Sequence, residues 1–276
     1  MKYVVKSDRI EIEKCDEFDI RQILECGQIF RFYENNGEYS CCSGDRFAKI
    51  IESDDKITIL TSDPRYFENF FDLKTDYAAI KKQLSADAFM AKAISYGKGI
   101  RILNREPLDC IIEFIISANN NITRIRKIVE RLCEGAGTKK SGYYAFPTID
   151  QLADRSLEFY NSLGAGYRGA YLFDTVQRLK LIDISILREM PTQDLKKFLI
   201  SLKGIGEKVA NCILLFGFHR MDTFPVDTWI AKVYADHFGG ELTSRVQITR
   251  FFEEKYGTLS GIAQQYLFYY KRECLE

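Results

Sequence analysis

The amino-acid sequence predicts an α+β fold, in which an N-terminal twisted antiparallel β-sheet domain is followed by a mainly helical part. Short β-prone runs joined by tight turns fill the first sixty or so residues. After Asp63-Pro64, apolar residues recur instead at helical spacing. The sequence contains neither an internal repeat nor a low-complexity linker, so we expect the two parts to pack closely.

Four runs near the N-terminus are predicted to be strands. Asn36-Gly37, between two of the β-prone runs, predicts a hairpin because both positions of such a turn need positive φ. Asp54-Asp55 marks a second tight connection. The predicted strands are Tyr3–Val5, Ile29–Tyr33, Phe47–Ile51 and Ile57–Leu60.

Helices are predicted over most of the remaining chain. Thr148 and Thr192 are expected to cap two of them, and Gly135–Gly142 is expected to be a loop. We divide the chain into residues 1–107, a β domain with the leading helices, and residues 108–276, the helical domain. The predicted helices are Tyr77–Leu84, Ile111–Ile116, Ile122–Cys133, Ile149–Ala153, Gly169–Leu181, Thr192–Ser201, Glu207–Phe218, Asp227–Phe238, Ser244–Tyr256 and Gly261–Glu273.

Composition limits the possible functions. With 276 residues and 46% hydrophobic residues, the chain can bury a substantial core. Its net charge is zero, so any surface that binds nucleic acid must be local. The eight cysteines form no C-x-x-C pair and only two histidines occur, so we expect no metal and no cofactor.

The prediction of cellular location depends on two features, a signal peptide and a membrane span. The segment Met1–Glu13 is charged and has no apolar core, so it does not resemble a signal peptide. No apolar run approaches the roughly 18 residues of a membrane span. We therefore expect a monomeric cytoplasmic protein, associated with the nucleoid if the source is bacterial, without a membrane partner.

Gly204-Ile205-Gly206 lies between two predicted helices and predicts a helix-hairpin-helix. Glycines allow a tight turn and leave backbone N–H groups free at a helix N-terminus, where a DNA phosphate binds well. The alternative interpretation is an ordinary connection between two helices.

Lys208 and Asp227 are the candidate catalytic residues. Lys208 lies in the first turn of a predicted helix, where burial and the positive helix end favour the neutral, nucleophilic amine. Asp227 can cap the next helix and still direct one oxygen into a cleft. Removal of a base from deoxyribose builds positive charge on the sugar, which a nearby carboxylate stabilises. Cys212, one turn after Lys208, can be a core residue or a polarizable wall against a base, and as a thiolate it would keep Lys208 protonated. The alternatives are a solvated lysine and a purely structural cap.

These residues resemble a known family. The hairpin with Lys208 and the loop Phe224–Asp227 are similar to the helix-hairpin-helix glycosylases with a Gly/Pro/Asp loop, and four further motifs resemble the eukaryotic-type 8-oxoguanine DNA glycosylases. The resemblance extends from about Phe18 to Phe268. The four motifs are Cys26–Arg31, Ser117–Arg124, Gly164–Arg168 and Ala263–Phe268.

The resemblance implies a glycosylase and abasic-site lyase that acts on duplex DNA containing an oxidised purine. Lys208 would attack the sugar C1′ and form a Schiff base, and Asp227 would stabilise the sugar cation. Gly27 would offer its backbone carbonyl to the N7 hydrogen that 8-oxoguanine has and guanine lacks. Cys212 and Phe268 would enclose the flipped base, and Gln264 would bind its Watson–Crick edge. Phe268 can also be a core residue.

The resemblance also implies a second group, which would contact the opposite strand. Asn119 would fill the gap left by the flipped base, Tyr167 would wedge beside it, and Arg124 and Arg168 would read the unpaired cytosine. Alternatively, Asn119–Asn121 can cap a helix and the two arginines can be surface charges. The sequence departs from the family at Thr228-Trp229, where familiar members place a histidine near the phosphate backbone.

Two other functions remain open at this point. A monofunctional alkylpurine glycosylase would share the architecture but would not need a lysine at position 208. A non-catalytic helix-hairpin-helix module would bind DNA without distinguishing lesions, and neither Lys208 nor Asp227 would be necessary.

Overall fold

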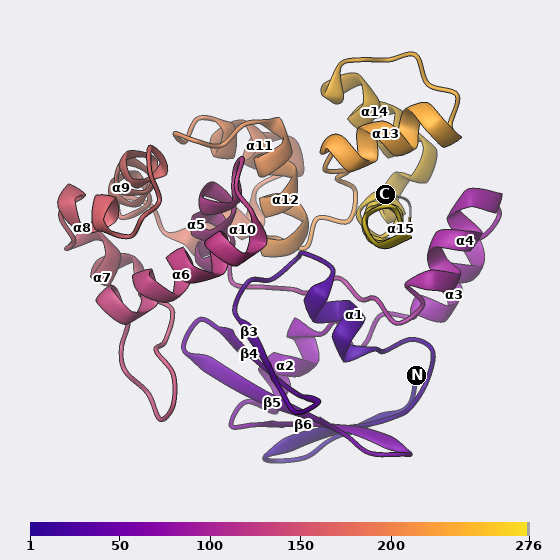
Figure 1. Ribbon diagram of the computed structural model, residues 1–276, viewed down its shortest axis with the longest axis horizontal. Helices are drawn as coiled ribbons and strands as arrows, with labels where there is room; N and C mark the ends of the chain where they lie inside the picture. The colour runs from indigo at the N-terminus through magenta and orange to yellow at the C-terminus, as the bar shows by residue number, and fades with distance from the viewer. Residues whose placement is uncertain (275–276) are drawn as a thin grey trace.

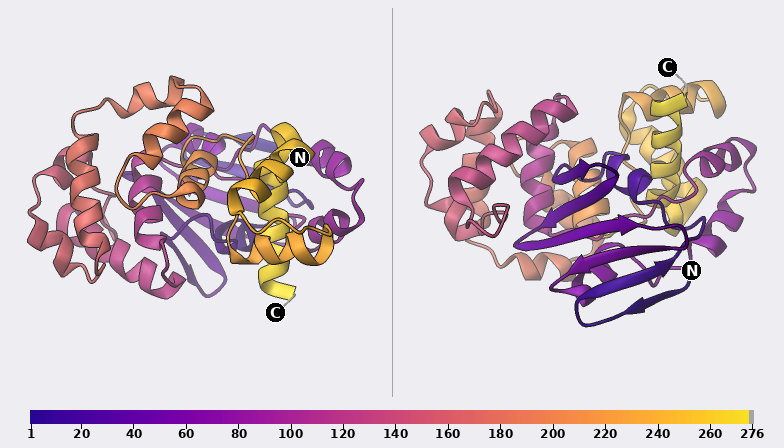
Figure 2. Two further views of the ribbon diagram at one scale, coloured as in Figure 1. Left: turned by 90° about the horizontal axis from the view of Figure 1, so that it is seen from above. Right: turned by 60° about the horizontal axis from the view of Figure 1, so that its bottom comes forward.

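The structure, a computed structural model, describes residues 1–274 and confirms the predicted α+β fold (Figure 1). Within these residues one antiparallel sheet has six strands in the order β1-β2-β6-β5-β4-β3. The sheet lies on one side of the molecule, and most of the helices lie on the other (Figures 1 and 2). The strands are β1 (Tyr3–Val5), β2 (Arg9–Glu13), β3 (Phe32–Asn35), β4 (Glu38–Ser43), β5 (Arg46–Glu52) and β6 (Lys56–Thr61).

The hairpin predicted at Asn36-Gly37 is confirmed. Asn35 pairs with Glu38, so the loop between β3 and β4 consists only of Asn36 and Gly37. Their φ angles are 54° and 82°, and two positive values are what a type I′ turn requires.

The strand predicted at Ile29–Tyr33 is wrong over its first three residues, because β3 begins at Phe32. The preceding segment is held by the helical part of the molecule. The ring of Phe30 packs edge-on against Phe114, with their centroids 5.8 Å apart. Apolar side chains in this segment thus serve tertiary packing, although their composition favours a strand.

The sheet and two short helices share an apolar core. Helix α1 (Ile20–Glu25) and helix α2 (Pro64–Phe70) bury their apolar side chains in it, and in Figure 1 both lie on the side of the sheet that faces the helical part. Alternate residues of the strands point into this core, as period-2 strands require. The alternation is clearest in β2, β5 and β6, where the buried residues are Ile10, Ile12, Ala48, Ile50, Ile57 and Ile59.

All ten predicted helices are present, with ends that differ by a few residues. Helices α1, α2, α4, α8 and α10 were not predicted. The helices after α2 are α3 (Tyr77–Leu84), α4 (Ala88–Tyr96), α5 (Pro107–Ser117), α6 (Ile122–Ala136), α7 (Ile149–Ala153), α8 (Leu157–Ser162), α9 (Arg168–Leu179), α10 (Ile184–Glu189), α11 (Thr192–Ile200), α12 (Glu207–Gly217), α13 (Thr228–His237), α14 (Arg245–Tyr256) and α15 (Ser260–Cys274).

Two local predictions are corrected. Gly135-Ala136 belongs to α6 and not to the following loop, because the helix closes with a hydrogen bond of 2.8 Å from Gly137 to the carbonyl of Cys133. Thr192 is the first residue of α11, whereas Pro191 is its N-cap. The capping role predicted for Thr148 is confirmed, since its side chain accepts the N–H of Gln151.

A second, larger core joins the helices. In it, α12 packs against α5 and α11, and α15 packs against α4, α13 and α14. Helices α3 and α4 precede residue 107 but contribute to this core together with the later helices. The division of the chain at residues 107–108 therefore stays a prediction.

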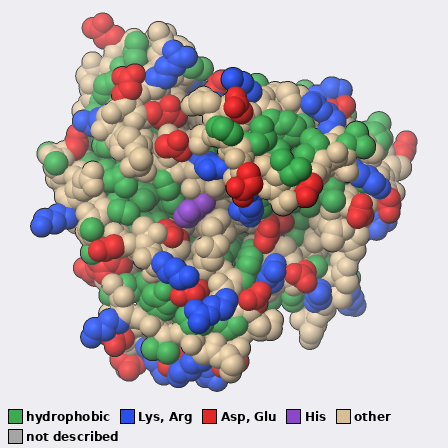
Figure 3. All heavy atoms as spheres, turned by 180° about the vertical axis from the view of Figure 1, so that it is seen from behind, with side chains coloured by type: hydrophobic (Ala, Val, Ile, Leu, Met, Phe, Trp, Pro, Cys, Tyr) green, Lys and Arg blue, Asp and Glu red, His purple; other side chains and the backbone are tan. Residues whose placement is uncertain are grey.

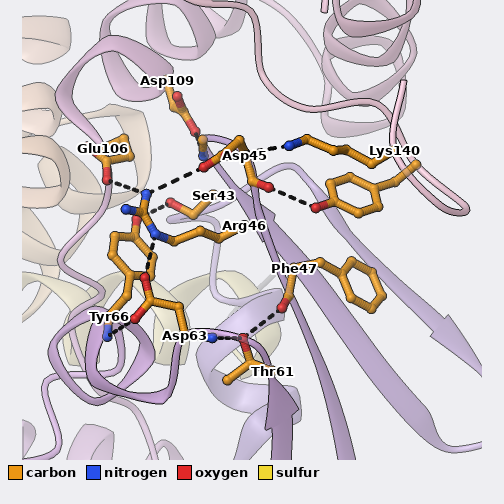
Figure 4. A network of polar contacts seen from close by, with 12 residues as sticks. Ser43, Asp45, Arg46, Phe47, Thr61, Asp63, Tyr66, Glu106, Asp109 and Lys140 are labelled. Carbon is orange, nitrogen blue, oxygen red and sulfur yellow. Dashed lines mark hydrogen bonds and ion pairs between the residues drawn. The ribbon is translucent and has the colours of Figure 1, made fainter. Parts of the chain in front are cut away.

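Polar contacts tie the turn between β4 and β5 to the helical part (Figure 4). The N–H of Gly44 donates to Asp109 on α5 at 2.8 Å, and the carbonyl of Gly44 accepts the N–H of Phe146 at 2.8 Å. Arg46, beside this turn, forms ion pairs with Asp63 at 2.8 Å and with a carboxylate at the start of α5. The sheet is thus anchored at the helix that also lines the candidate site.

Charges of both signs are interspersed on the face opposite to that of Figure 1, in agreement with the zero net charge (Figure 3). Over residues 1–274, no helix combines the length and the apolar character that crossing a membrane requires.

Candidate functional site

The hairpin between α11 and α12 is built as predicted. Gly204 has φ +83°, a left-handed conformation that favours glycine. A Cβ atom at Gly204 would lie 2.7 Å from the side chain of Tyr171, so the turn also depends on the absence of a side chain. Gly206 is the N-cap of α12, and a Cβ atom there would meet nothing within 4 Å. The first N–H groups of α12 therefore begin at an open surface, as a phosphate site requires.

Lys208 and Asp227 line one cavity with a volume of about 60 Å³. The walls come from five parts of the chain, namely the segment after α1, helices α5, α12 and α15, and the loop before α13. The cavity is lined by Gly27, Phe114, Lys208, Cys212, Phe216, Pro225, Asp227, Gln264, Gln265 and Phe268.

Asp227 has both the structural and the site position that the sequence suggested. Its Oδ1 accepts the N–H of Ile230 at 2.9 Å, so the prediction that it caps α13 is confirmed. The same side chain lines the cavity that contains Lys208. A cap fixed to a helix end holds a carboxylate in one place, which is what stabilisation of a developing positive charge requires.

The loop that carries Asp227 is clamped at Phe224. The N–H of Phe224 donates to Glu253 at 3.3 Å, and its carbonyl accepts the hydroxyl of Thr249 at 3.2 Å. Its ring stacks on Phe252 with centroids 4.3 Å apart. Helix α14, which supplies all three partners, therefore sets the position of Asp227.

Lys208 and Cys212 lie one turn apart on α12. The ammonium nitrogen of Lys208 lies 5.8 Å from the centroid of the Phe114 ring, which forms the apolar side of its surroundings. Burial raises the pKa of the Cys212 thiol, and the opposing charge of Lys208 does not cancel this effect. Cys212 is therefore a neutral thiol at ordinary pH and does not hold Lys208 protonated.

Gly27 lies where the backbone passes close to side chains of α15. Its φ is +88°, and a Cβ atom would lie 3.3 Å from both Phe268 and Arg272. Gln264 is almost fully buried, and its Oε1 has no hydrogen-bond partner among residues 1–274. An unpaired buried acceptor is costly unless a ligand donates to it. Phe268 is partly buried and lines the cavity as well as contacting the core.

Arg168 is buried, with 4% exposure, so the alternative of a surface charge is wrong for it. Its guanidinium donates to the carbonyls of Ala118 and Asn119, the latter at 2.7 Å. It also lies over the ring of Tyr167, 4.4 Å from the centroid. The structure thus brings together three of the four residues predicted for the opposite strand. Tyr167 is 55% exposed, and Asn119 has a φ of +50°.

Arg124, the fourth, is exposed and donates to the carbonyl of Gly164 at 2.9 Å, in the loop that precedes Tyr167. Asn121 caps α6, so capping is confirmed for that member of the asparagine run but not for Asn119. These residues lie outside the cavity walls. At the departure from the family pattern, Thr228 is exposed at the start of α13.

Sequence reasoning missed several residues of the cavity. Phe114 and Phe216 follow helical periodicity, which does not distinguish a cavity wall from core. Gln265 lies next to Gln264 in the motif Ala263–Phe268, but neither its residue type nor the family resemblance predicts a role for it. Among residues 1–274 no cluster of three or more metal-ligating side chains occurs.

Comparisons with known proteins point to one family. Residues 9–111 match the family model described as 8-oxoguanine DNA glycosylase, N-terminal domain. The probable N-glycosylase/DNA lyase of Methanothermobacter thermautotrophicus is 31% identical over 230 residues, covering 74% of this chain and 73% of that protein. The N-glycosylase/DNA lyase OGG1 of Arabidopsis thaliana is 33% identical over 62% of this chain, a match that spans only 52% of the plant protein.

A solved structure is similar over almost the whole chain. It is the 8-oxoguanine glycosylase/lyase of Clostridium acetobutylicum in complex with duplex DNA that contains cytosine opposite 8-oxoguanine. The identity is 34%, the TM-score is 0.92, and the match covers 99% of this chain and 98% of that one.

Proposed function

The chain belongs to the 8-oxoguanine DNA glycosylases, and from that premise we propose that it releases 8-oxoguanine from duplex DNA and nicks the strand at the abasic site. One observation carries the proposal. Lys208, Asp227 and Gly27, which are far apart in the sequence, line the same cavity. Together they supply a nucleophile, a stabilising carboxylate and a test for the lesion.

Lys208 is the proposed nucleophile. Its neutral amine attacks C1′ of the flipped nucleotide, the C1′–N9 bond breaks, and the base leaves with the electron pair and takes up a proton. Asp227 stabilises the positive charge that develops on the sugar. Opening of the sugar ring gives a Schiff base, and loss of a C2′ proton then expels the 3′ phosphate by β-elimination.

Gly27 is the proposed lesion test. Its carbonyl accepts a hydrogen bond from N7–H of 8-oxoguanine but meets a lone pair on N7 of guanine. Phe268 and Cys212 enclose the flipped purine, and a donor on its Watson–Crick edge satisfies the free Oε1 of Gln264. Phe268, Cys212 and Gln264 line one cavity, so all three can contact a base that enters it.

Arg124 and Arg168 are the proposed readers of the opposite cytosine. Each now donates to backbone carbonyls, and DNA binding would exchange part of these bonds for the acceptors of the base. Asn119 fills the gap in the duplex, and Tyr167 wedges beside it. The hairpin at Gly204–Gly206 holds a backbone phosphate. We propose that the protein works where the genome lies, in the cytoplasm if the source is bacterial.

The two alternative functions have less support. A monofunctional alkylpurine glycosylase does not need an amine in the cavity, yet Lys208 lines it. A non-catalytic module does not need the buried, unpaired acceptor of Gln264.

A trapping experiment tests the proposed function. With a duplex containing 8-oxoguanine opposite cytosine, borohydride should reduce the Schiff base and leave a covalent protein–DNA complex. Lys208→Gln should give no complex while still binding the duplex. Failure of the wild-type protein to trap, or full trapping by Lys208→Gln, would refute the lysine mechanism. Release of 3-methyladenine without nicking would favour the alkylpurine alternative, and equal affinity for undamaged DNA without base release would favour the binding module.

A further inference from the structure

Two side chains of α15 hold the backbone immediately before Gly27. Arg272 donates from Nη2 to the carbonyl of Glu25, and Gln265 donates from Nε2 to the carbonyl of Cys26, both at 2.7 Å. These partners are separated by more than two hundred residues in the sequence. Successive carbonyls are thus fixed by a single helix.

The backbone immediately after Gly27 is held from another direction. The carbonyl of Gln28 accepts Nη1 of Arg105 at 3.0 Å. The side chain of Gln28 accepts the N–H of Leu103 and donates to the carbonyl of Arg101, both at 2.8 Å. The residue after Gly27 is therefore anchored to the segment that leads into α5.

Gly27 itself is the exception in this segment. Its carbonyl accepts no hydrogen bond from residues 1–274, although the carbonyls of Glu25, Cys26 and Gln28 each accept one. Gln265 is only 2% exposed, so its donor would be costly to leave unpaired, and its bond to Cys26 is accordingly persistent. The arrangement leaves one free acceptor, held on both sides, at the wall of the cavity.

We propose that Gln265 and Arg272 are positioning residues that set the preference for 8-oxoguanine over guanine by aiming the carbonyl of Gly27. The inference rests on the proposed function. A hydrogen bond weakens steeply when its distance or angle is poor. 8-Oxoguanine and guanine differ at N7, the atom that the carbonyl of Gly27 contacts in the proposed complex. A carbonyl whose orientation is not fixed therefore loses most of its ability to distinguish the two bases.

Gln265→Met tests the inference directly, because methionine has a similar length but no donor. Two single-turnover rates are measured, namely base release from a duplex with 8-oxoguanine opposite cytosine and strand cleavage at a preformed abasic site. Base release should fall about tenfold, while cleavage of the abasic site, where no base is read, should change less than about twofold. Release of guanine, measured in parallel, should not fall.

Arg272 supplies the matched pair of variants. Arg272→Met should reproduce the selective loss of 8-oxoguanine release, whereas Arg272→Lys, which keeps a donor for the carbonyl of Glu25, should recover most of it. A purely structural role would lower both rates together and would lower the melting temperature in proportion.

The outcomes separate the two proposals. A wild-type protein that releases no 8-oxoguanine contradicts the proposed function. A wild-type protein that does so, with Gln265→Met either unchanged in both rates or reduced equally in both, overturns the positioning role alone.

Discussion

At the scale of single residues, the chemistry of the site depends on which side chains carry charge. Burial raises the pKa of the Cys212 thiol and so favours its neutral form, and Asp227 is the carboxyl group that lines the same cavity as Lys208. Cys212 can then act as a polarizable wall for the base. The hydrogen bond by which Asp227 caps α13 fixes the position of this carboxyl group.

Asp227→Asn should separate stability from catalysis. Asparagine caps a helix about as well as aspartate, so the melting temperature should change by less than about 2 °C. The positive charge on the sugar would lose its stabilising carboxylate, and base release should slow by about 100-fold or more. Thermal unfolding and single-turnover kinetics check both expectations. Base release at the wild-type rate would contradict the catalytic role of Asp227.

Arg124→Ala should relax the preference for cytosine with little other effect. Arg124 is exposed and its side chain makes one hydrogen bond among residues 1–274, to the carbonyl of Gly164, so its truncation should not disturb the fold. The ratio of the excision rate opposite cytosine to the rates opposite the other three bases should fall by about tenfold. This change corresponds to the loss of one good hydrogen-bonded contact to a base. Arg168→Ala should relax the same preference but also lower stability, since the buried Arg168 holds the loop at Ala118-Asn119. Unchanged ratios in both variants would rule out this role.

At the scale of elements, the hairpin depends on two glycines in different ways. Gly204 is needed for its positive φ and for the space next to Tyr171, whereas Gly206 has an extended conformation and open surroundings. The first therefore shapes the turn, and the second leaves the helix end accessible.

The variants Gly204→Ala and Gly206→Ala form a matched pair. Gly204→Ala should cost about 1–3 kcal/mol of stability, seen as a drop of about 2–4 °C in melting temperature per kcal/mol. Gly206→Ala should melt close to the wild type. Both should weaken binding to duplex DNA, the first by deforming the hairpin and the second by placing a methyl group in front of the helix N-terminus. Wild-type affinity of Gly206→Ala would contradict phosphate binding there.

How far the helices could be predicted depended only partly on their length, since the five-residue α7 was predicted and the nine-residue α4 was not. Long amphipathic helices such as α6 were found by their periodicity, but α2, α8 and α10 have only six or seven residues, too few to establish a period. A usable signal did exist at α2, where Asp63 is the N-cap and Pro64 opens the helix. The strand predicted from Ile29 failed because tertiary packing overrode its β-prone composition.

The candidate site was also predictable only in part. All six residues predicted to carry the chemistry and to hold the base line one cavity, because each belongs to a motif that can be recognised locally. The roles of Gln265 and the burial of Arg168 were not predictable, since both depend on backbone carbonyls brought close only by the fold.

At the scale of the whole molecule, the junction between the sheet and α5 contains a buried carboxyl group. Burial, aided by the neighbouring Glu113, raises the pKa of Asp109 to about 7 from an ordinary value of 3.8. Asp109 accepts the N–H of Gly44 across this junction (Figure 4). The folded protein thus favours the protonated acid, so ionisation of Asp109 opposes folding.

Asp109→Asn should make stability less dependent on pH. In the wild type the contribution of Asp109 is most favourable below pH 4, declines as pH rises toward 7, and is then constant. Asparagine keeps an acceptor for Gly44 and cannot ionise. The free energy of unfolding of the variant, relative to the wild type, should therefore rise by about 1–4 kcal/mol between pH 4 and pH 8. Urea denaturation measures this difference, and a constant value across the range would show that the pKa of Asp109 is the same in the folded and unfolded states.

The clamp between α15 and the segment before Gly27 also has a consequence for the order in which the protein is made. Gln265 is synthesised 239 residues after Cys26, whose carbonyl it holds. On the roles proposed above, a nascent chain contains Lys208 and the hairpin before the residues that aim the carbonyl of Gly27 are made. A product truncated before α15 would therefore lack the proposed discrimination between 8-oxoguanine and guanine while still containing the lysine.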